Sequence, residues 1–396
     1  MSAGKRLCVV LLGLAVVIGD PTRASEQCEN PAKIVTELGH REQVPEDFAP
    51  VAGGVVAYPS PAQANARYVR VRFSVTDVPD CQWFFTVRDP DHRPIEVFGR
   101  DDFQGVTTRW THRINGAPAL FDLVPCDGGR APAIKLLEYV WMPAGAANPY
   151  YSLQSQLPAY REITTVDTAM RRLGDVAAFL VSSWDRASWV CTGVMLTPTL
   201  LLTNWHCGGP PTLPEKGFWN LDIVRDTLID LSFDGDAHSR ELQITGTATT
   251  PNKNLDFVVL RTAALDALGP VRPVRISTTP LAANDEIRVV HHPAGKVKQL
   301  SWNCRVRNPD YRGWQDATVL SEFTHSCDTE GGSSGAPILD RQGALVGLHH
   351  LGFDFDAAKC VQTDRENKAV KIASILDAIR NDKKDIYDEI MRWQKR

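Results

Sequence analysis

The chain has 396 residues, of which 43% are hydrophobic and 23% charged, and its 43 basic and 47 acidic side chains leave a net charge of −4. This balance excludes a histone-like polycation and an acidic solvating tail, and it provides no field that favours nucleic acid. The hydrophobic content excludes wholesale disorder. At roughly 100–200 residues per domain, the length predicts two or three domains, each able to bury a core.

The first 24 residues have the composition of a secretory signal. Lys5 and Arg6 precede an apolar run from Leu7 to Ile18, and small residues lead up to Ala24. Because the run is shorter than the ~20 residues that span a bilayer, stable membrane insertion is not expected. We expect cleavage after Ala24 and a secreted or periplasmic protein.

Cysteine usage points to an oxidising compartment. The chain has nine cysteines, and Cys8 lies in the predicted signal, so an even number remains in the mature part. An even count in an exported chain is typical of disulfides rather than of zinc or redox sites, and no metal or cofactor is predicted.

Residues 25–160 are predicted to form an accessory β-sandwich-like domain and a linker, either retained or removed as a propeptide. Short alternating runs of β-forming residues, separated by turns, occur at 68–73, 83–87 and 95–98. This pattern favours a small antiparallel sandwich, which a Cys81–Cys126 disulfide could close. The stretch 143–149, rich in Ala, Gly and Pro, marks the approach to the linker.

Residues 161–396 again show short strands separated by turns. Apolar runs at 177–181, 200–202 and 257–260 predict strands that are buried on both faces. Toward the end, apolar residues at mostly helical spacings predict one terminal helix from Ala373 to Trp393.

Three segments carry residues suited to chemistry. His206 follows an apolar strand and directly precedes Cys207, while Cys191 is placed to close a short loop beneath it. Asp256 stands at the head of an apolar run, and Ser334 lies in a glycine-rich turn that leads into a strand.

Acyl transfer explains why these residue types occur together. A serine hydroxyl becomes a good nucleophile when a neutral imidazole takes its proton, and that imidazole needs a buried carboxylate. The three roles fall to Ser334, His206 and Asp256. Glycines let backbone N–H groups converge on a developing oxyanion, and the N–H groups of Gly332 and Ser334 are the best candidates.

With these motifs, the chain resembles a trypsin-like (chymotrypsin-fold) serine endopeptidase. The resemblance is carried by residues 203–207, 254–256 and 332–337, in the family's order of His, Asp and Ser, and by the spacing of Cys191 and Cys207. It implies an all-β, double β-barrel fold over residues 161–396, with protein or peptide substrates.

Some alternatives stay open. Asp236 and Asp266 are less apolar-flanked rivals for the carboxylate. Ser333 competes as nucleophile, because it also satisfies the G-x-S-x-G elbow of lipases and esterases. That fold needs Ser, then an acid, then His, and His349 and His350 follow Ser333 too closely for it.

Ser333 also departs from the family pattern. It stands where many digestive members carry an aspartate that pairs with a newly cut N-terminus, and no matching start is visible near Arg172. We therefore expect an oxyanion hole that does not depend on this switch. His292 and His350 are expected to be surface or packing residues.

Within the family, the likeness is closest to the bacterial glutamyl and lysyl endopeptidases. In glutamyl enzymes, a threonine and a histidine at the positions of Thr329 and His349 contact an acidic side chain before the scissile bond. Asp328 and Asp364 instead lie near positions where basic-specific enzymes carry an aspartate. The sequence favours an acidic preference only slightly.

The remaining cysteines suggest further pairs. Cys304 and Cys327 bracket a hairpin-sized stretch and are expected to pair. Cys28 and Cys360 are then left over, and their pairing would tie the N-terminal segment to the protease.

A second hypothesis is an adhesive or carbohydrate-binding protein with an inactive protease-like half. The N-terminal aromatic residues Trp83, Trp110 and Trp141 motivate it, and this domain could bind an unknown surface or ligand. Core packing is the favoured interpretation of all three, and the intact triad argues against inactivity.

Overall fold

The computed structural model describes residues 37–396 with short gaps. The gaps lie at residues 45–48, 51–53, 59–64, 104–106, 144–150, 153–159, 211, 236–239, 265–270, 317, 353–354, 357–360 and 363–365. The predicted signal, Cys28, Cys360 and Asp364 fall outside the described residues, as do the rival carboxylates Asp236 and Asp266. Among the described residues, no helix is both long and apolar enough to cross a membrane.

Two antiparallel sheets form residues 37–143, which we call the N-terminal unit. One sheet consists of β2 (Val55–Tyr58), β8 (Ala119–Val124), β4 (Phe84–Arg88) and β5 (Pro94–Phe98). The other consists of β1 (Glu37–Gln43), β9 (Ala133–Pro143), β3 (Ala66–Thr76), β6 (Thr108–Trp110) and β7 (Ile114–Asn115). The two sheets share one hydrophobic core, as the predicted sandwich requires.

The core of the N-terminal unit follows from strand alternation. Along β3, Val69, Val71 and Phe73 are fully buried, and the residues between them are only partly so. Trp83 is also fully buried, so it is a core residue, and the predicted Cys81–Cys126 disulfide is present.

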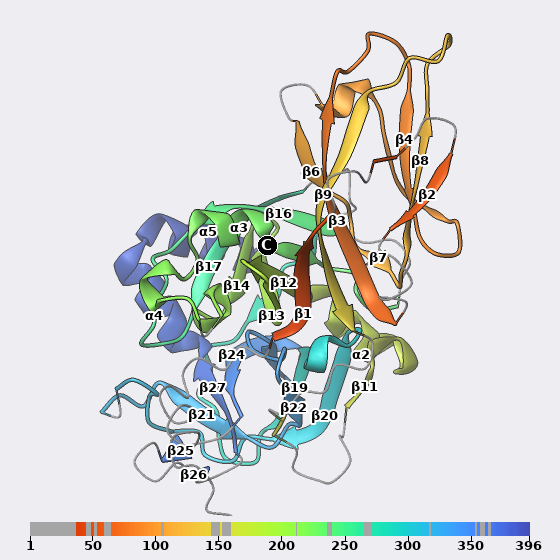
Figure 1. Cartoon of the computed structure of the whole chain (residues 1–396). Coiled ribbons are helices and arrows are strands. Elements are labelled where there is room, and N and C mark those ends of the chain that lie inside the picture. Colours follow the sequence, from red (N-terminus) through yellow and green to blue (C-terminus); the bar gives the residue numbers. More distant parts are fainter. Residues whose placement is uncertain are drawn as a thin grey trace, which may run out of the picture.

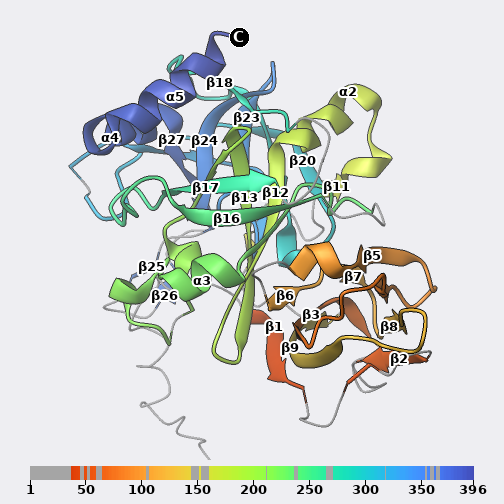
Figure 2. The same cartoon turned by 90° about the horizontal axis from the view of Figure 1, so that it is seen from above.

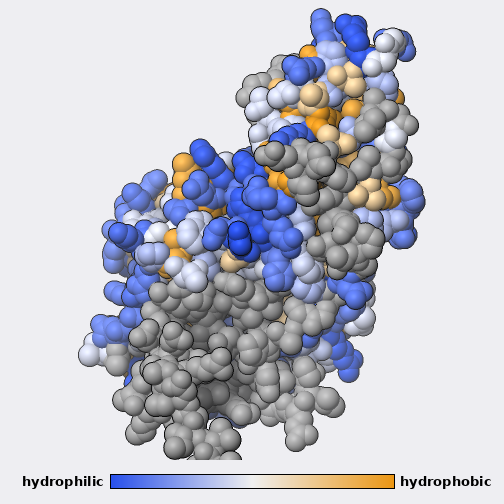
Figure 3. Space-filling view, in the orientation of Figure 1, coloured by the Kyte–Doolittle hydropathy of each residue, from blue (hydrophilic) through white to orange (hydrophobic). Residues whose placement is uncertain are grey.

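Four large apolar side chains are exposed among the described residues of the N-terminal unit, Val78, Phe84, Val97 and Val124. Phe84 on β4 pairs with Val124 on β8, and Val97 lies on the neighbouring strand β5. Figure 3 shows apolar surface on this part of the molecule, in the upper part of the view. A binding role for the unit stays a prediction.

The first barrel is closed by six strands. These are β12 (Ala177–Trp184), β13 (Ala187–Thr197), β14 (Leu200–Thr203), β15 (Leu228–Asp230), β16 (Glu241–Thr247) and β17 (Val258–Ala264). Pairing of β12 with β13 closes the ring. Strand β1 pairs with β9 on one side and β13 on the other, so the N-terminal unit and this barrel share an 11-stranded sheet (Figure 1).

The second barrel is an open half-barrel. It consists of β11 (Tyr160–Glu162), β20 (Gln299–Arg305), β19 (Glu286–His291), β23 (Pro337–Asp340), β24 (Ala344–Leu351), β27 (Asn367–Lys371), β21 (Glu322–His325) and β18 (Arg275–Ile276). Two small pairs accompany it, β10 (Tyr151–Ser152) with β22 (Thr329–Glu330), and β25 (Phe355–Asp356) with β26 (Val361–Gln362). The predicted double-barrel fold is thus confirmed.

Helices are few and short apart from the C-terminal pair. They are α2 (Thr168–Arg171), α3 (Leu221–Asp226), α4 (Ile372–Asp382) and α5 (Lys384–Gln394), with 3-10 turns η3 (Arg100–Phe103), η4 (Ile163–Thr165), η5 (Arg172–Val176), η6 (His206–Gly208), η7 (Glu215–Gly217) and η8 (Pro293–Gly295). Figure 2 shows α4 and α5 beside β24 and β27.

The predicted terminal helix is present but divided in two, because the chain breaks at Lys383 (φ −141°, ψ 82°). The apolar spacing from Ile379 to Ile386 fits an unbroken helix, so sequence alone does not reveal the break. At the end of α4, the Asp382 carboxylate accepts hydrogen bonds from the backbone N–H and hydroxyl of Thr250. These bonds hold the end of α4 against the loop that contains Thr250.

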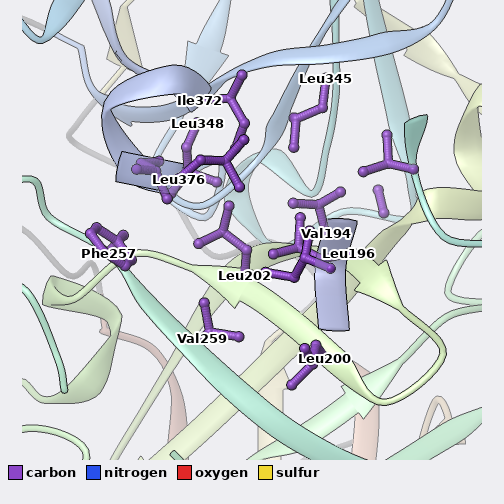
Figure 4. Close-up of a cluster of buried hydrophobic side chains, with 14 of the residues drawn as sticks. Val194, Leu196, Leu200, Leu202, Phe257, Val259, Leu345, Leu348, Ile372 and Leu376 are labelled. Carbon is purple, nitrogen blue, oxygen red and sulfur yellow. The ribbon is translucent and has the colours of Figure 1, made fainter. Parts of the chain in front are cut away.

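The seam between the two barrels is a single hydrophobic cluster. Val194 and Leu202 come from the first barrel, Leu345 and Leu348 from the second, and Leu376 from α4. Figure 4 shows these side chains gathered around a common centre. Because the cluster joins strands of both barrels, it holds the two barrels together.

Candidate active site

A buried carboxylate holds the predicted catalytic histidine at two points. His206 lies in η6, directly after β14, where the predicted Cys191–Cys207 disulfide anchors the loop. Its backbone N–H donates to Asp256 Oδ1 (2.9 Å) and its Nδ1 lies 2.7 Å from Asp256 Oδ2. Because an ionised carboxylate only accepts, Nδ1 carries the proton and Nε2 is left as a base.

The position of Asp256 is set by the turn before β17. Its backbone adopts φ 47°, and its carbonyl accepts a hydrogen bond from Asn204 Nδ2 (2.8 Å). Burial alone would raise the pKa of Asp256, but His206 and His350 outweigh burial and hold the pKa below its usual range. The carboxylate therefore stays charged.

His350 is a site residue that the sequence analysis missed. It is not a surface residue, because its side chain is fully buried, with Nδ1 3.3 Å from Asp256 Oδ2 and Nε2 3.2 Å from Glu322 Oε2. Burial favours the neutral ring, yet the Glu322 charge and Asp256 raise the pKa of His350 to about 9. The Asp256 carboxylate thus serves two imidazoles. His292, by contrast, packs between Phe179 and Phe233, as expected.

Ser334 lies beside the histidine loop. Its carbonyl oxygen accepts a hydrogen bond from the N–H of Thr192 (2.8 Å) and lies 4.0 Å from Cys207 Sγ. Gly335 follows with φ 83°, and a Cβ there would lie 2.0 Å from the Thr192 carbonyl oxygen, so this close approach requires glycine. No hydrogen bond within the described residues joins Ser334 Oγ to His206 Nε2. Such bonds often form fully only with substrate bound.

The turn before Ser334 presents two free N–H groups. The Ser333 N–H donates to the Glu330 carbonyl (3.0 Å), and Gly332 has φ 95°, which together define a type II turn. The Gly331 carbonyl accepts from the Ala294 N–H (2.7 Å), so in the trans peptide the Gly332 N–H points the opposite way. Among the described residues, neither the Gly332 N–H nor the Ser334 N–H has a hydrogen-bond partner. We call residues 330–333 the oxyanion turn.

The hydroxyl of Ser333 is already committed. It is buried, and its Oγ lies 2.7 Å from His291 Nδ1 and accepts the Glu330 N–H (3.2 Å). Ser301 Oγ donates to the Asp328 carbonyl (2.8 Å) and so accepts from His291 Nε2–H (3.1 Å). His291 Nδ1 is then the acceptor for the Ser333 hydroxyl, and Ser333 has no proton free for nucleophilic chemistry.

The hydrogen-bonded groups behind Ser333, the His291 ring and the Ser301 hydroxyl, are uncharged. Burial is the main cause that lowers the pKa of His291 to about 3, and the Lys296 charge adds to it. A hydroxyl and an uncharged imidazole thus replace the ion pair that a cut N-terminus would make, in agreement with the expectation for Ser333.

Hydrogen bonds around the predicted specificity residues define their proton positions. Asn367 Nδ2 donates to the Cys327 carbonyl, so its Oδ1 faces Thr329 and accepts the Thr329 hydroxyl proton (2.7 Å). In this arrangement the Thr329 hydroxyl donates to Asn367, and its donor role toward an acidic side chain stays a prediction. Asp328, which directly precedes Thr329, is also buried.

His349 has an N–H donor on Nε2, which follows from the hydrogen bonds of its neighbour His325. The Cys327 N–H donates to His325 Nδ1 (3.3 Å), so neutral His325 carries its proton on Nε2 and donates to His349 Nδ1 (3.3 Å). Burial, with the neighbouring imidazoles, holds the pKa of His349 well below its usual value. The neutral ring of His349 then has its proton on Nε2. The predicted Cys304–Cys327 disulfide anchors this region.

A double barrel with a histidine–carboxylate pair beside a serine in a glycine-rich turn defines a serine hydrolase. The family model described as a trypsin-like peptidase domain matches residues 191–348. Residues 191–348 are thus similar to trypsin-like peptidase domains.

The similarity extends to named proteins. Over 196 residues the chain is 28% identical to Secreted RxLR effector protein 73 of Plasmopara viticola, an alignment that covers 46% of each chain. The chain thus spans less than half the length of this curated relative. Crystal structures of the Rv3671c protease of M. tuberculosis are also similar: the inactive form at 17% identity and a TM-score of 0.37, covering 55% of this chain and 96% of that one. For the active form the values are 16%, 0.38, 57% and 90%.

The His350 charge predicts a pH-dependent stability. Since its pKa is about 9 in the folded protein against an ordinary 6.5, its stabilising contribution is present below pH 6.5 and is lost as the pH rises through 9. The shift corresponds to about 3 kcal/mol. Urea unfolding at pH 6 and pH 10 should show this loss in the wild type and not in His350→Gln. The exposed His92→Gln variant should behave as the wild type; identical pH profiles for His350→Gln and the wild type would contradict the assignment.

Proposed function

We propose that the protein is a serine endopeptidase in which His206, Asp256 and Ser334 form the catalytic triad. The observation that carries this is the double hydrogen bond from His206 to Asp256, since it sets both the ring orientation and the tautomer that general-base catalysis needs. The position of Ser334 against the same disulfide-anchored loop supports its role as nucleophile.

The reaction follows from these positions. His206 Nε2 takes the proton of Ser334 Oγ, which attacks the scissile carbonyl carbon. The oxyanion that forms accepts hydrogen bonds from the Gly332 and Ser334 N–H groups. His206 then returns the proton to the leaving amine, and water hydrolyses the acyl-enzyme by the same steps.

The two adjacent serines allow a matched test of the nucleophile. Ser334→Ala should lower kcat for peptide hydrolysis by ~10⁴-fold or more and abolish labelling by a fluorophosphonate. Ser333→Ala should keep the label on Ser334 and lose only ~10-fold, because it loosens the turn without deleting an oxyanion donor. Mass spectrometry of labelled peptides locates the adduct. An adduct on Ser333, or full activity of Ser334→Ala, would refute the triad.

The proposed substrates are peptides with an acidic residue before the scissile bond. With the Thr329 hydroxyl committed to Asn367, this preference rests on the His349 Nε2–H donor alone. A hydrogen bond to a charged carboxylate contributes roughly 1.5–3 kcal/mol, or ~10–100-fold in rate.

Peptide libraries derived from a proteome measure this preference directly. We expect cleavage after Glu or Asp. In His349→Leu, the ratio of kcat/KM for Glu peptides to kcat/KM for Gln peptides should fall ~10–100-fold. Thr329→Val should leave the Glu-to-Gln ratio unchanged. A preference for lysine or large apolar residues would overturn the proposal.

We further propose that the protein is exported through residues 1–24. The three disulfides, Cys81–Cys126, Cys191–Cys207 and Cys304–Cys327, support an oxidising compartment. N-terminal sequencing of protein from the medium or the periplasm should start at Ser25. Protein that stays in the cytosol with residues 1–24 attached would contradict export.

A further inference from the structure

The oxyanion turn depends on one neighbouring loop. We call residues 291–295, between β19 and β20, the brace loop. It supports the turn through His291, whose ring contacts the Ser333 hydroxyl, and through the Ala294 N–H, which donates to the Gly331 carbonyl (2.7 Å). The turn packs so closely on the loop that a Cβ on Gly332 would lie 2.6 Å from the His292 carbonyl oxygen. The direction of the Gly332 N–H is therefore set by the brace loop.

The brace loop has a backbone conformation that needs outside support. Ala294 adopts φ 50° and ψ 32°, the left-handed region that costs free energy for any residue with a Cβ. Such a conformation persists only where the surroundings hold it in place. The peptide that follows Ala294 is held from the N-terminal unit.

Arg67 supplies that support. It lies on β3, 227 positions earlier in the chain, and its Nη1 donates to the Ala294 carbonyl (3.0 Å). Met142, on the partner strand β9, packs against the next residue, since a Cβ on Gly295 would lie 2.5 Å from Met142 Sδ. The two long strands of the N-terminal unit thus end on the brace loop. Figure 1 shows β3 and β9 running down toward β19 and β20.

The other side of the oxyanion turn is held by β11. The Tyr160 hydroxyl donates to the Glu330 carboxylate, and Lys296 Nζ lies 2.6 Å from Tyr160 Oη and 3.2 Å from Glu330 Oε1. Strand β10 also pairs with β22, which contains Glu330. Residues that precede the first barrel therefore contact the turn from two directions.

The N-terminal unit is docked by a buried ion pair. Arg113 donates through Nε to Asp230 Oδ2 (2.6 Å), and both side chains are fully buried. The Arg113 guanidinium also lies over the ring of Phe233, 4.5 Å from its centroid, and Phe233 stacks on His292 of the brace loop. Removal of one partner would leave an uncompensated buried charge, so both residues are needed for the unit to dock in this way.

We propose that Arg67 is a positioning residue for the oxyanion turn, and that the N-terminal unit is retained in the working enzyme as part of its catalytic machinery. The proposal rests on the endopeptidase function proposed above. On this proposal, residues 37–143 act as an intramolecular activator and are not a propeptide that is removed.

Substitution of Arg67 in the full-length chain tests the proposal. Arg67→Met should lower kcat per titrated active site ~10–100-fold, at most the effect of losing one oxyanion donor, with KM within about twofold. Arg67→Lys, which keeps a donor, should recover most of the loss. The matched control is Arg72→Met, on the same strand but paired with Glu138 inside the N-terminal unit, and it should keep wild-type kcat. A kcat within twofold of the wild type for Arg67→Met overturns the proposal.

A second measurement separates this inference from the function itself. Amide hydrogen exchange of peptides covering residues 291–296 and 330–335 should be faster in Arg67→Met than in the wild type and unchanged in Arg72→Met. This readout needs no activity, so it supports or overturns the bracing even if the wild type cleaves no peptide. If Arg67→Met does not fold, Arg67→Ala, which also lacks a donor, takes its place. Fully active enzyme that lacks residues 25–160 would overturn the proposal.

Discussion

The buried charge of Asp256 is the interaction on which the rest of this structure depends. An ionised carboxylate without water must have partners, and here they come from both barrels: His206 from the first, and His350, backed by Glu322, from the second. The hydrophobic seam brings the barrels together, but it is non-directional. The hydrogen bonds of Asp256 select one relative placement, in which a neutral imidazole is left with its Nε2 beside Ser334.

A second constraint acts on the oxyanion turn. Its shape depends on the brace loop, which in turn contacts Arg67 and Met142 of the N-terminal unit. The network behind Ser333 uses a hydroxyl and a neutral imidazole, and because the pKa of His291 is about 3, this network does not titrate near neutral pH. The carboxylate that orients the catalytic base is thus charged, whereas the hydroxyl and imidazole directly behind Ser333 are neutral.

Much of the fold and of the site could be predicted from local patterns in the sequence. Alternation along β3 and the apolar runs of β12, β14 and β17 mark strands, because side chains alternate between faces. The spacing of Cys191 and Cys207 and the glycines around Ser334 are also short-range signals. His350 was misjudged, because its two charged partners lie 94 and 28 positions away. The break at Lys383 was hidden because apolar residues on either side keep helical phase.

The sequence by itself determined the residue types that acyl transfer requires, their order, and the loops that carry them. Only the tertiary structure decided what those residues can do. The Thr329 hydroxyl proton is directed to Asn367, and the Ser333 hydroxyl proton is directed to His291. Arg67 reaches the oxyanion turn across 227 positions of sequence. The physical reason is that proton positions and backbone strain are set by contacts between distant segments, and no local pattern records which distant groups will meet.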